Sequence, residues 1–147
     1  MEIKKILTEI KYEKSYDEIK ALISETTNPV LLHMIMVNYN WDDGFYIPEC
    51  IIQNRYCDLG TALMIFDYAD GYLFLLDNNE HIEDIDWKNF IEQLKLEIQN
   101  RKFKTQKIKY LPELSRAEKL KIKKLYPDLD SVFSDGTSGE EIGLIIV

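Results

Sequence analysis

The sequence predicts a mainly α-helical protein, folded as a compact irregular helical bundle or as a stack of helix hairpins. Two observations support this class: apolar residues recur at helical spacing from residue 15 to residue 126, and helix-capping residues precede most of these runs. The loops between the runs are short, which favours antiparallel neighbouring helices. Residues 142–147 are rich in β-branched side chains, so a short C-terminal β element beside residues 108–111 is an additional expectation.

The first predicted helices lie before and after Asn28-Pro29. Ser15 or Asp17 is the expected N-cap of the earlier helix, and Asn28 caps the later one with proline at its first position. Residues 30–38 of the later helix are apolar on nearly every side, which predicts a central, buried helix. Residues 40–44 end this helix, because Asn, Asp and Gly tolerate turn conformations.

Three helical segments are expected in the middle of the chain. A short helix begins at Pro48 and includes residues 50–52, and Asp58 caps the next one, which ends at Asp70-Gly71. The apolar run of residues 72–76 is also interpreted as helical. The Asp58-capped helix has apolar residues at positions i, i+3, i+4 and i+7: Leu59, Ala62, Leu63 and Phe66.

Two amphipathic helices complete the prediction. The longer one follows an Asp84 or Asp86 cap, and the other begins with the S-x-x-E capping box of residues 115–118 and ends before Pro127. The apolar face of the longer helix consists of Trp87, Phe90, Ile91, Leu94 and Ile98.

Composition and charge limit the classes of function. A chain of 147 residues with 46% hydrophobic and 12% aromatic residues is expected to fold as one domain over residues 1–147, and this composition excludes disordered and fibrous proteins. Within that domain, residues 101–147 are expected to form a basic helix and an acidic tail. The net charge is −8, and residues 21–100 hold fourteen acidic residues against three basic ones. This acidic block favours a basic protein partner.

Other partners and cofactors are not favoured. The amino terminus lacks the apolar segment of a secretory signal, and the longest apolar runs have five residues, so a cytoplasmic protein with no membrane partner is expected. Phosphate-binding glycine loops and metal-ligand spacings are missing, so we expect no cofactor and no metal, and no catalytic residue is identified. Lysines and arginines in residues 101–124 suit phosphates, but the acidic remainder would repel a nucleic acid. Cys50 and Cys57 are expected to be reduced.

The candidate binding residues are concentrated in one turn and one acidic loop. We expect them to bind the basic partner: Asn40, Trp41, Asp42, Asp43, Glu80 and Glu83. The alternative is an enzyme or small-ligand binder, with a pocket formed by His33, Tyr39, Trp41 and Asp42. Structural roles also explain these residues, as a capped turn with a Trp over the core and, for His33, as a hydrogen-bonded core histidine. A homodimer formed through a helix face or residues 142–147 stays open.

Two short motifs carry a resemblance to a known family. The strings Y-N-W-D-D-G at residues 39–44 and C-D-L-G-T-A-L at residues 57–63, with Pro48 and Phe66, resemble a bacterial family catalogued as domain of unknown function 4274. The resemblance covers residues 28–76 and extends more loosely through the Trp87 helix, so it implies a family-like core of about residues 28–100. The family has no known activity to carry over to this chain, so the question of an enzyme stays open. The resemblance implies an immunity-type or accessory role, because the family resembles small acidic proteins encoded near bacterial toxin systems.

Overall fold

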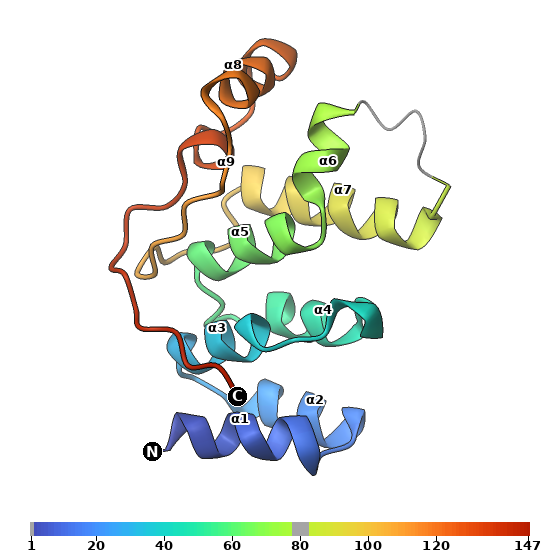
Figure 1. The fold of residues 1–147 in the computed structure, drawn as a ribbon, viewed down its shortest axis with the longest axis vertical. Coiled ribbons are helices and arrows are strands. Elements are labelled where there is room, and N and C mark those ends of the chain that lie inside the picture. The colour runs from blue at the N-terminus through green and yellow to red at the C-terminus, as the bar shows by residue number, and fades with distance from the viewer. Residues whose placement is uncertain (1, 78–82) are drawn as a thin grey trace.

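The computed structural model describes residues 2–77 and 83–147, and within these residues it confirms the mainly α-helical class (Figure 1). The elements in chain order are α1 (Ile3–Tyr12), α2 (Tyr16–Glu25), α3 (Pro29–Val37), the 3-10 helix η1 (Trp41–Asp43), α4 (Tyr46–Gln53), α5 (Leu59–Tyr68), α6 (Gly71–Leu76), α7 (Ile85–Gln99), α8 (Arg116–Leu125) and α9 (Val132–Asp135).

The helices stack in two columns along the long axis of the molecule (Figure 1). In one column α3 packs between α1 and α5, and in the other α4 packs on α2. Helix α7 packs on α5 and continues the second column, because its Phe90 ring stacks on Phe45 beside α4 with centroids 4.6 Å apart. Helices α6, α8 and α9 cover the far end of the stack. Successive pairs of short helices therefore build an elongated body.

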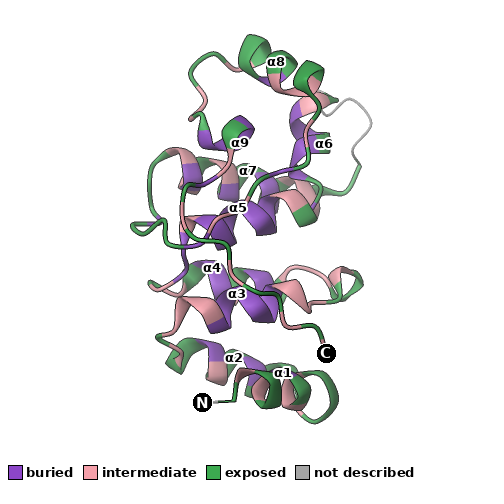
Figure 2. Cartoon of the chain, turned by 60° about the vertical axis from the view of Figure 1, so that its left-hand side comes forward, coloured by how far each residue is buried: buried purple, intermediate pink, exposed green. Residues whose placement is uncertain are grey.

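The core follows the middle of this stack (Figure 2). Six of the nine residues of α3 are buried, and residues 60–66 of α5 are all buried, which matches the predicted central position of the apolar helix at residues 30–38. Phe66 of α5 meets Tyr72 and Phe133 edge-on, each at 5.2 Å between ring centroids. One continuous apolar cluster thus extends from α1 to α9.

The predicted caps are confirmed where the sequence offered a choice. Ser15, rather than Asp17, caps α2 and forms a capping box with Glu18. Asp84, rather than Asp86, caps α7, and its carboxylate accepts the Trp87 backbone N–H at 3.0 Å. The other predicted N-caps are found as expected: Asn28 on α3, Asp58 on α5 and Ser115 on α8.

Several boundaries differ from the prediction. Helices α1 and α9 were not expected: α1 has no side-chain N-cap, and α9 has only four residues. Helix α4 begins at Tyr46, two residues before Pro48. Proline is tolerated at this third position because the N–H groups of the first turn have no partner within the helix. Asp70 has a left-handed backbone (φ 63°), which turns the chain directly from α5 into α6.

The expected C-terminal β element is not formed. Over the described residues there is no strand, and the nearest feature is an isolated parallel bridge between Ile108 and Glu140. Residues 142–147 are extended but lie against helix α3, which has no free backbone edge for a strand to pair with. The side chain of Asn38 bonds to their backbone instead.

Candidate functional site

The C-D-L-G-T-A-L motif holds a buried carboxylate that anchors a distant segment. Asp58 is fully buried, and each of its oxygens accepts two hydrogen bonds. Oδ1 accepts the Thr105 hydroxyl and the Lys107 backbone N–H, both at 2.7 Å. Oδ2 accepts the backbone N–H groups of Gly60 and Ile108, both at 3.0 Å. Asp58 therefore caps α5 and at the same time fixes residues 105–108 across the start of that helix.

Gly60 makes this crossing possible. A Cβ atom at this position would lie 2.1 Å from the carbonyl oxygen of Ile108, far inside van der Waals contact. The bare backbone lets the crossing segment approach the helix closely. Glycine is required here because of this close packing and not because of its backbone conformation, since Gly60 is an ordinary helical residue of α5.

His33 is a core histidine, as one interpretation of the sequence expected. It is 3% exposed, and its Nδ1 lies 2.8 Å from the Thr61 hydroxyl oxygen. Burial lowers the pKa of His33 to about 4, and the neighbouring Asp58 only partly opposes this shift. His33 is thus neutral at physiological pH and joins α3 to α5.

The Y-N-W-D-D-G turn is also organised by local bonds. Asn40 accepts the Asp42 backbone N–H at 3.1 Å, and the Tyr39 hydroxyl donates to the Gly44 carbonyl at 2.6 Å. The rings of Tyr39 and Trp41 meet edge-on at 5.2 Å. The indole Nε1 of Trp41 is buried, and no group in the described part of the chain accepts from it. The carboxylates of this turn, by contrast, are exposed.

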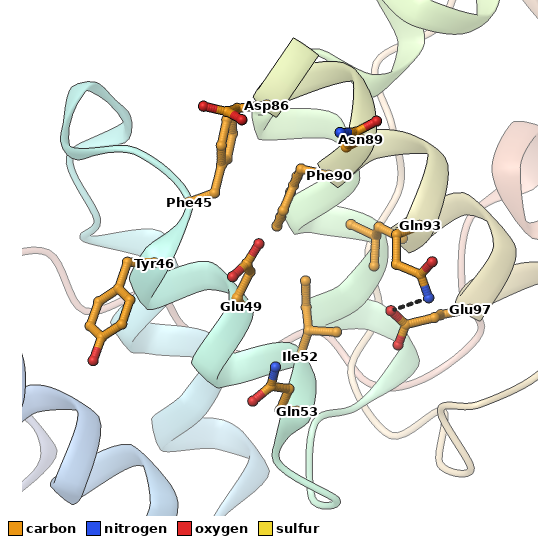
Figure 3. Close-up of a pocket in the computed structure, with 11 residues that line it drawn as sticks. Phe45, Tyr46, Glu49, Ile52, Gln53, Asp86, Asn89, Phe90, Gln93 and Glu97 are labelled. Atoms are coloured by element: carbon orange, nitrogen blue, oxygen red, sulfur yellow. Dashed lines mark hydrogen bonds between the residues drawn. The ribbon is translucent and has the colours of Figure 1, made fainter.

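A groove opens between α4 and α7, next to this turn (Figure 3). Its volume is about 560 Å³. Apolar side chains from both helices form its floor, and the stacked rings of Phe45 and Phe90 close one end. We call this feature the α4–α7 groove; it is lined by Phe45, Tyr46, Glu49, Ile52, Gln53, Asp86, Asn89, Phe90, Gln93, Leu94 and Glu97.

The rim of the α4–α7 groove is acidic. It carries the carboxylates of Glu49, Asp86 and Glu97, and none of the lining residues is basic. Glu97 is paired with Lys102 and accepts a hydrogen bond from Gln93 at 3.3 Å. Among the described residues, Glu49 and Asp86 form no ion pair. Two uncompensated carboxylates therefore face the groove.

None of the described residues among the predicted binding residues lines this groove. The turn of Asn40–Asp43 is separated from Phe45 by Gly44, and Glu83 is separated from α7 by its N-cap Asp84. Along the chain, both precede the end of the groove where Asp86 lies beside Phe45 (Figure 3). Figure 1 places η1 and the start of α7 at the same edge of the stack. Glu80 lies outside the described residues.

The residues that line the α4–α7 groove were not predicted as a site from the sequence. The α7 side of the groove is a stripe of residues at i, i+3, i+7 and i+11, which spans about 16 Å of helix. This spacing was visible beside the apolar face, but it does not reveal that α4 lies opposite. The stripe consists of Asp86, Asn89, Gln93 and Glu97.

The residues of the alternative ligand pocket are placed less favourably. Tyr39 and Trp41 are in contact, but His33 is bonded to Thr61, and Asp42 is exposed. None of five surface grooves in the described part of the chain is lined by these four residues, and none is lined by the turn of Asn40–Asp43 or by Glu83. The candidate site is therefore the α4–α7 groove itself, because of its own acidic lining.

Two general features concern the described residues only. No group of three or more His, Cys, Asp or Glu side chains within residues 2–77 and 83–147 is arranged to hold a metal ion. Across the same residues, every helix is too short or too polar to cross a bilayer. Both cysteines are free thiols; Cys57 is buried, and burial raises its pKa.

The central helices resemble a known protein family. Residues 27–99 match the model of a family described as "Domain of unknown function (DUF4274)", which confirms the resemblance carried by the two motifs. The matched range begins one residue before the Asn28 cap of α3 and ends with α7, so it includes both sides of the α4–α7 groove. No curated protein and no solved structure matches the chain.

Proposed function

We propose that this chain, which resembles the DUF4274 family over α3–α7, is a protein-binding module whose α4–α7 groove and adjoining acidic edge bind a basic partner. The lining of the groove is the observation that carries this proposal. Carboxylates and amides surround an apolar floor, and no cation lines it. Such a surface offers apolar contact at its centre and charge-assisted hydrogen bonds to lysine or arginine at its rim.

The charge distribution supports the same partner. Residues 21–100 carry fourteen acidic and three basic residues, and the groove is built from this block. A field of one sign accelerates encounter with a partner of opposite sign, and this acceleration weakens as salt rises. Binding through this surface should therefore depend strongly on ionic strength.

An immunity-type or accessory role in a bacterial cytoplasm is the form of this function that the family resemblance suggests. Proteins that cleave nucleic acids carry basic grooves for the phosphate backbone. An acidic module that occupies such a groove would block access of the substrate. This form of the proposal requires a partner whose basic surface is its substrate-binding surface.

The experiment is an affinity capture from the host lysate, followed by titration calorimetry with the purified captured protein. The test variant combines Glu49→Gln with Asp86→Asn, which removes two charges from the groove without changing side-chain size. The matched control combines Glu92→Gln with Asp128→Asn, which removes two charges from a separate groove between α7 and the segment after α8.

We expect the test variant to bind the basic partner about tenfold more weakly at low salt, and the control to bind within about twofold of the unmodified chain. The difference should shrink as salt is raised to 500 mM. Equal affinities of the two variants, or a captured partner that is acidic, would contradict the proposal.

A further inference from the structure

The last residues of the chain run back along the whole stack. After α9 the chain passes α5 and α3 and ends beside α1 (Figure 1). Backbone pairing holds it only as far as Glu140, which exchanges bonds with Lys107 and Lys109 at 2.8 and 2.9 Å. Beyond Glu140, no backbone-to-backbone hydrogen bond is formed within the described residues. Residues 142–147, the tail segment, are therefore held by side chains alone.

Most of the hydrogen bonds that hold the tail segment come from α3 and its C-cap Asn38. The Asn38 amide donates to the Ile145 carbonyl at 2.8 Å, and its Oδ1 accepts the Val147 N–H at 2.9 Å. A side-chain amide presents one donor and one acceptor side by side, as a peptide group does, so Asn38 acts as a substitute for one residue of a neighbouring strand. Met34, one turn earlier, lies 3.5 Å from the Ile145 nitrogen through its sulfur.

Exposure alternates over residues 144–147 as it does in a half-buried strand. Ile145 and Val147 are partly buried and pack against the core, whereas Leu144 and Ile146 are 59% and 66% exposed. Lys11 of α1 donates to the Val147 main-chain oxygen at 2.8 Å. No residue of the tail segment is charged. The α1–α3 face thus recognises an extended backbone with aliphatic side chains at alternate positions.

We propose that the α1–α3 face is a binding site for an extended, uncharged aliphatic peptide. The tail segment is its intramolecular occupant, and a partner segment with the same pattern replaces it. The tail segment is held by a few side-chain hydrogen bonds, so a competing segment has few contacts to replace. This site is separate from the α4–α7 groove and does not depend on the function proposed above.

The test uses the full chain with residues 142–147 all changed to glycine or serine, so that the face is empty. The probe is a fluorescein-labelled synthetic peptide with the sequence of residues 142–147, and binding is measured by fluorescence anisotropy. In the unmodified chain, the attached tail segment competes with the peptide for the α1–α3 face at an effective concentration in the millimolar range. We therefore expect the peptide to bind the empty-face variant at least tenfold more tightly than the unmodified chain.

Two comparisons separate specific binding from adhesion of an aliphatic peptide. Adding Asn38→Ala to the empty-face variant should weaken binding by tenfold or more, because two backbone hydrogen bonds are lost. Adding Asn100→Ala instead, at an exposed residue after α7, should leave binding unchanged. A folded empty-face variant that does not bind 1 mM peptide, or binding that Asn38→Ala does not alter, overturns the proposal.

If the empty-face variant does not fold, as judged by loss of its helical circular dichroism signal, a second measurement tests the proposal in the otherwise unmodified chain. In the unmodified chain, Asn38→Ala should speed hydrogen exchange at the Val147 amide by tenfold or more, with exchange at the buried amides of α5 unchanged. An unchanged rate at Val147 would show that Asn38 does not hold the tail segment, and the proposal would fall.

Discussion

Replacing Asp58 with asparagine should destabilise the protein far more than the change of one atom suggests. Both carboxylate oxygens accept hydrogen bonds from two donors, and the side chain is fully buried. In Asp58→Asn, one oxygen becomes an NH2 group. Whichever oxygen is replaced, the new donor faces two donors that have no other acceptor at this position, and at least one of them is a backbone N–H.

The magnitude follows from the two donors that lose their acceptor. The asparagine can keep its oxygen toward the buried Gly60 and Ile108 N–H groups, so its NH2 group faces the donors of the exposed residues Thr105 and Lys107. A buried donor without a partner costs about 1–3 kcal/mol, so two partly buried donors at the low end of this range give a loss of about 2 kcal/mol in the free energy of unfolding. A single domain of this size has a free energy of unfolding of about 5–15 kcal/mol. Asp58→Asn should therefore remove a substantial part of the total stability and break the hydrogen bonds of Thr105 and Lys107 to residue 58.

The assay is urea unfolding followed by circular dichroism, with hydrogen exchange at Lys107 and Ile108 as a local measurement. The matched control is Asp84→Asn, because Asp84 is also an N-cap but is exposed and, among the described residues, accepts one backbone N–H. Asn caps helices about as well as Asp, so the control should stay within about 0.5 kcal/mol of the unmodified chain. If both variants lost the same amount, Asp58 would be an ordinary helix cap and the reasoning would be refuted.

Three further predictions concern neighbouring features. Gly60→Ala should lower the free energy of unfolding by about 2 kcal/mol in urea titrations, because its Cβ would lie 2.1 Å from the Ile108 carbonyl, although alanine favours helix. The pKa of His33 is lowered from 6.5 to about 4 in the folded state, so the unfolded chain binds a proton at this residue first as the pH falls. The free energy of unfolding should therefore be unaffected by His33 well above pH 6.5 and should decrease below it. The loss should be about 1 kcal/mol between pH 7.5 and 5.5, and His33→Gln should abolish this part of the slope. Ser115→Ala should cost about 1 kcal/mol in thermal unfolding, because the capping box of α8 is lost.

The sequence revealed the elements that are specified by neighbouring residues. The apolar periodicity of α7, the Asn28-Pro29 start of α3 and the Ser115 capping box each lie within one stretch of chain, so they could be identified without knowledge of the fold. Helix α1 lacks such a signal, because its N-cap Glu2 makes no side-chain bond. It is stabilised instead by packing Leu7 into the core.

The path of the tail segment could not be predicted for a different reason. Its aliphatic residues predicted a β element, and within the described residues no strand is formed there. Its partner, however, is Asn38, which lies 109 positions from Val147 along the chain. A β-branched run shows that a segment can be extended, but the surface that receives it depends on how the helices stack.

The candidate site shows the same division between local and distant information. The acidic turn at residues 40–43 could be identified as a candidate, yet the bonds of Asn40 and Tyr39 show that much of its motif shapes the backbone. The C-D-L-G-T-A-L motif likewise serves the fold through Asp58 and Gly60, and the partners that these two residues hold lie beyond the matched residues 27–99.

It follows that the residues that carry the family resemblance are poor guides to a binding function. A residue that is fixed by the fold, such as Asp58, cannot also turn toward a partner, because all of its acceptor positions are used. Glu49 and Asp86 lie outside both motifs, line the α4–α7 groove and, over the described residues, form no ion pair. Substitution of these two residues therefore tests binding with the least disturbance of the fold, whereas substitution within the motifs measures stability first.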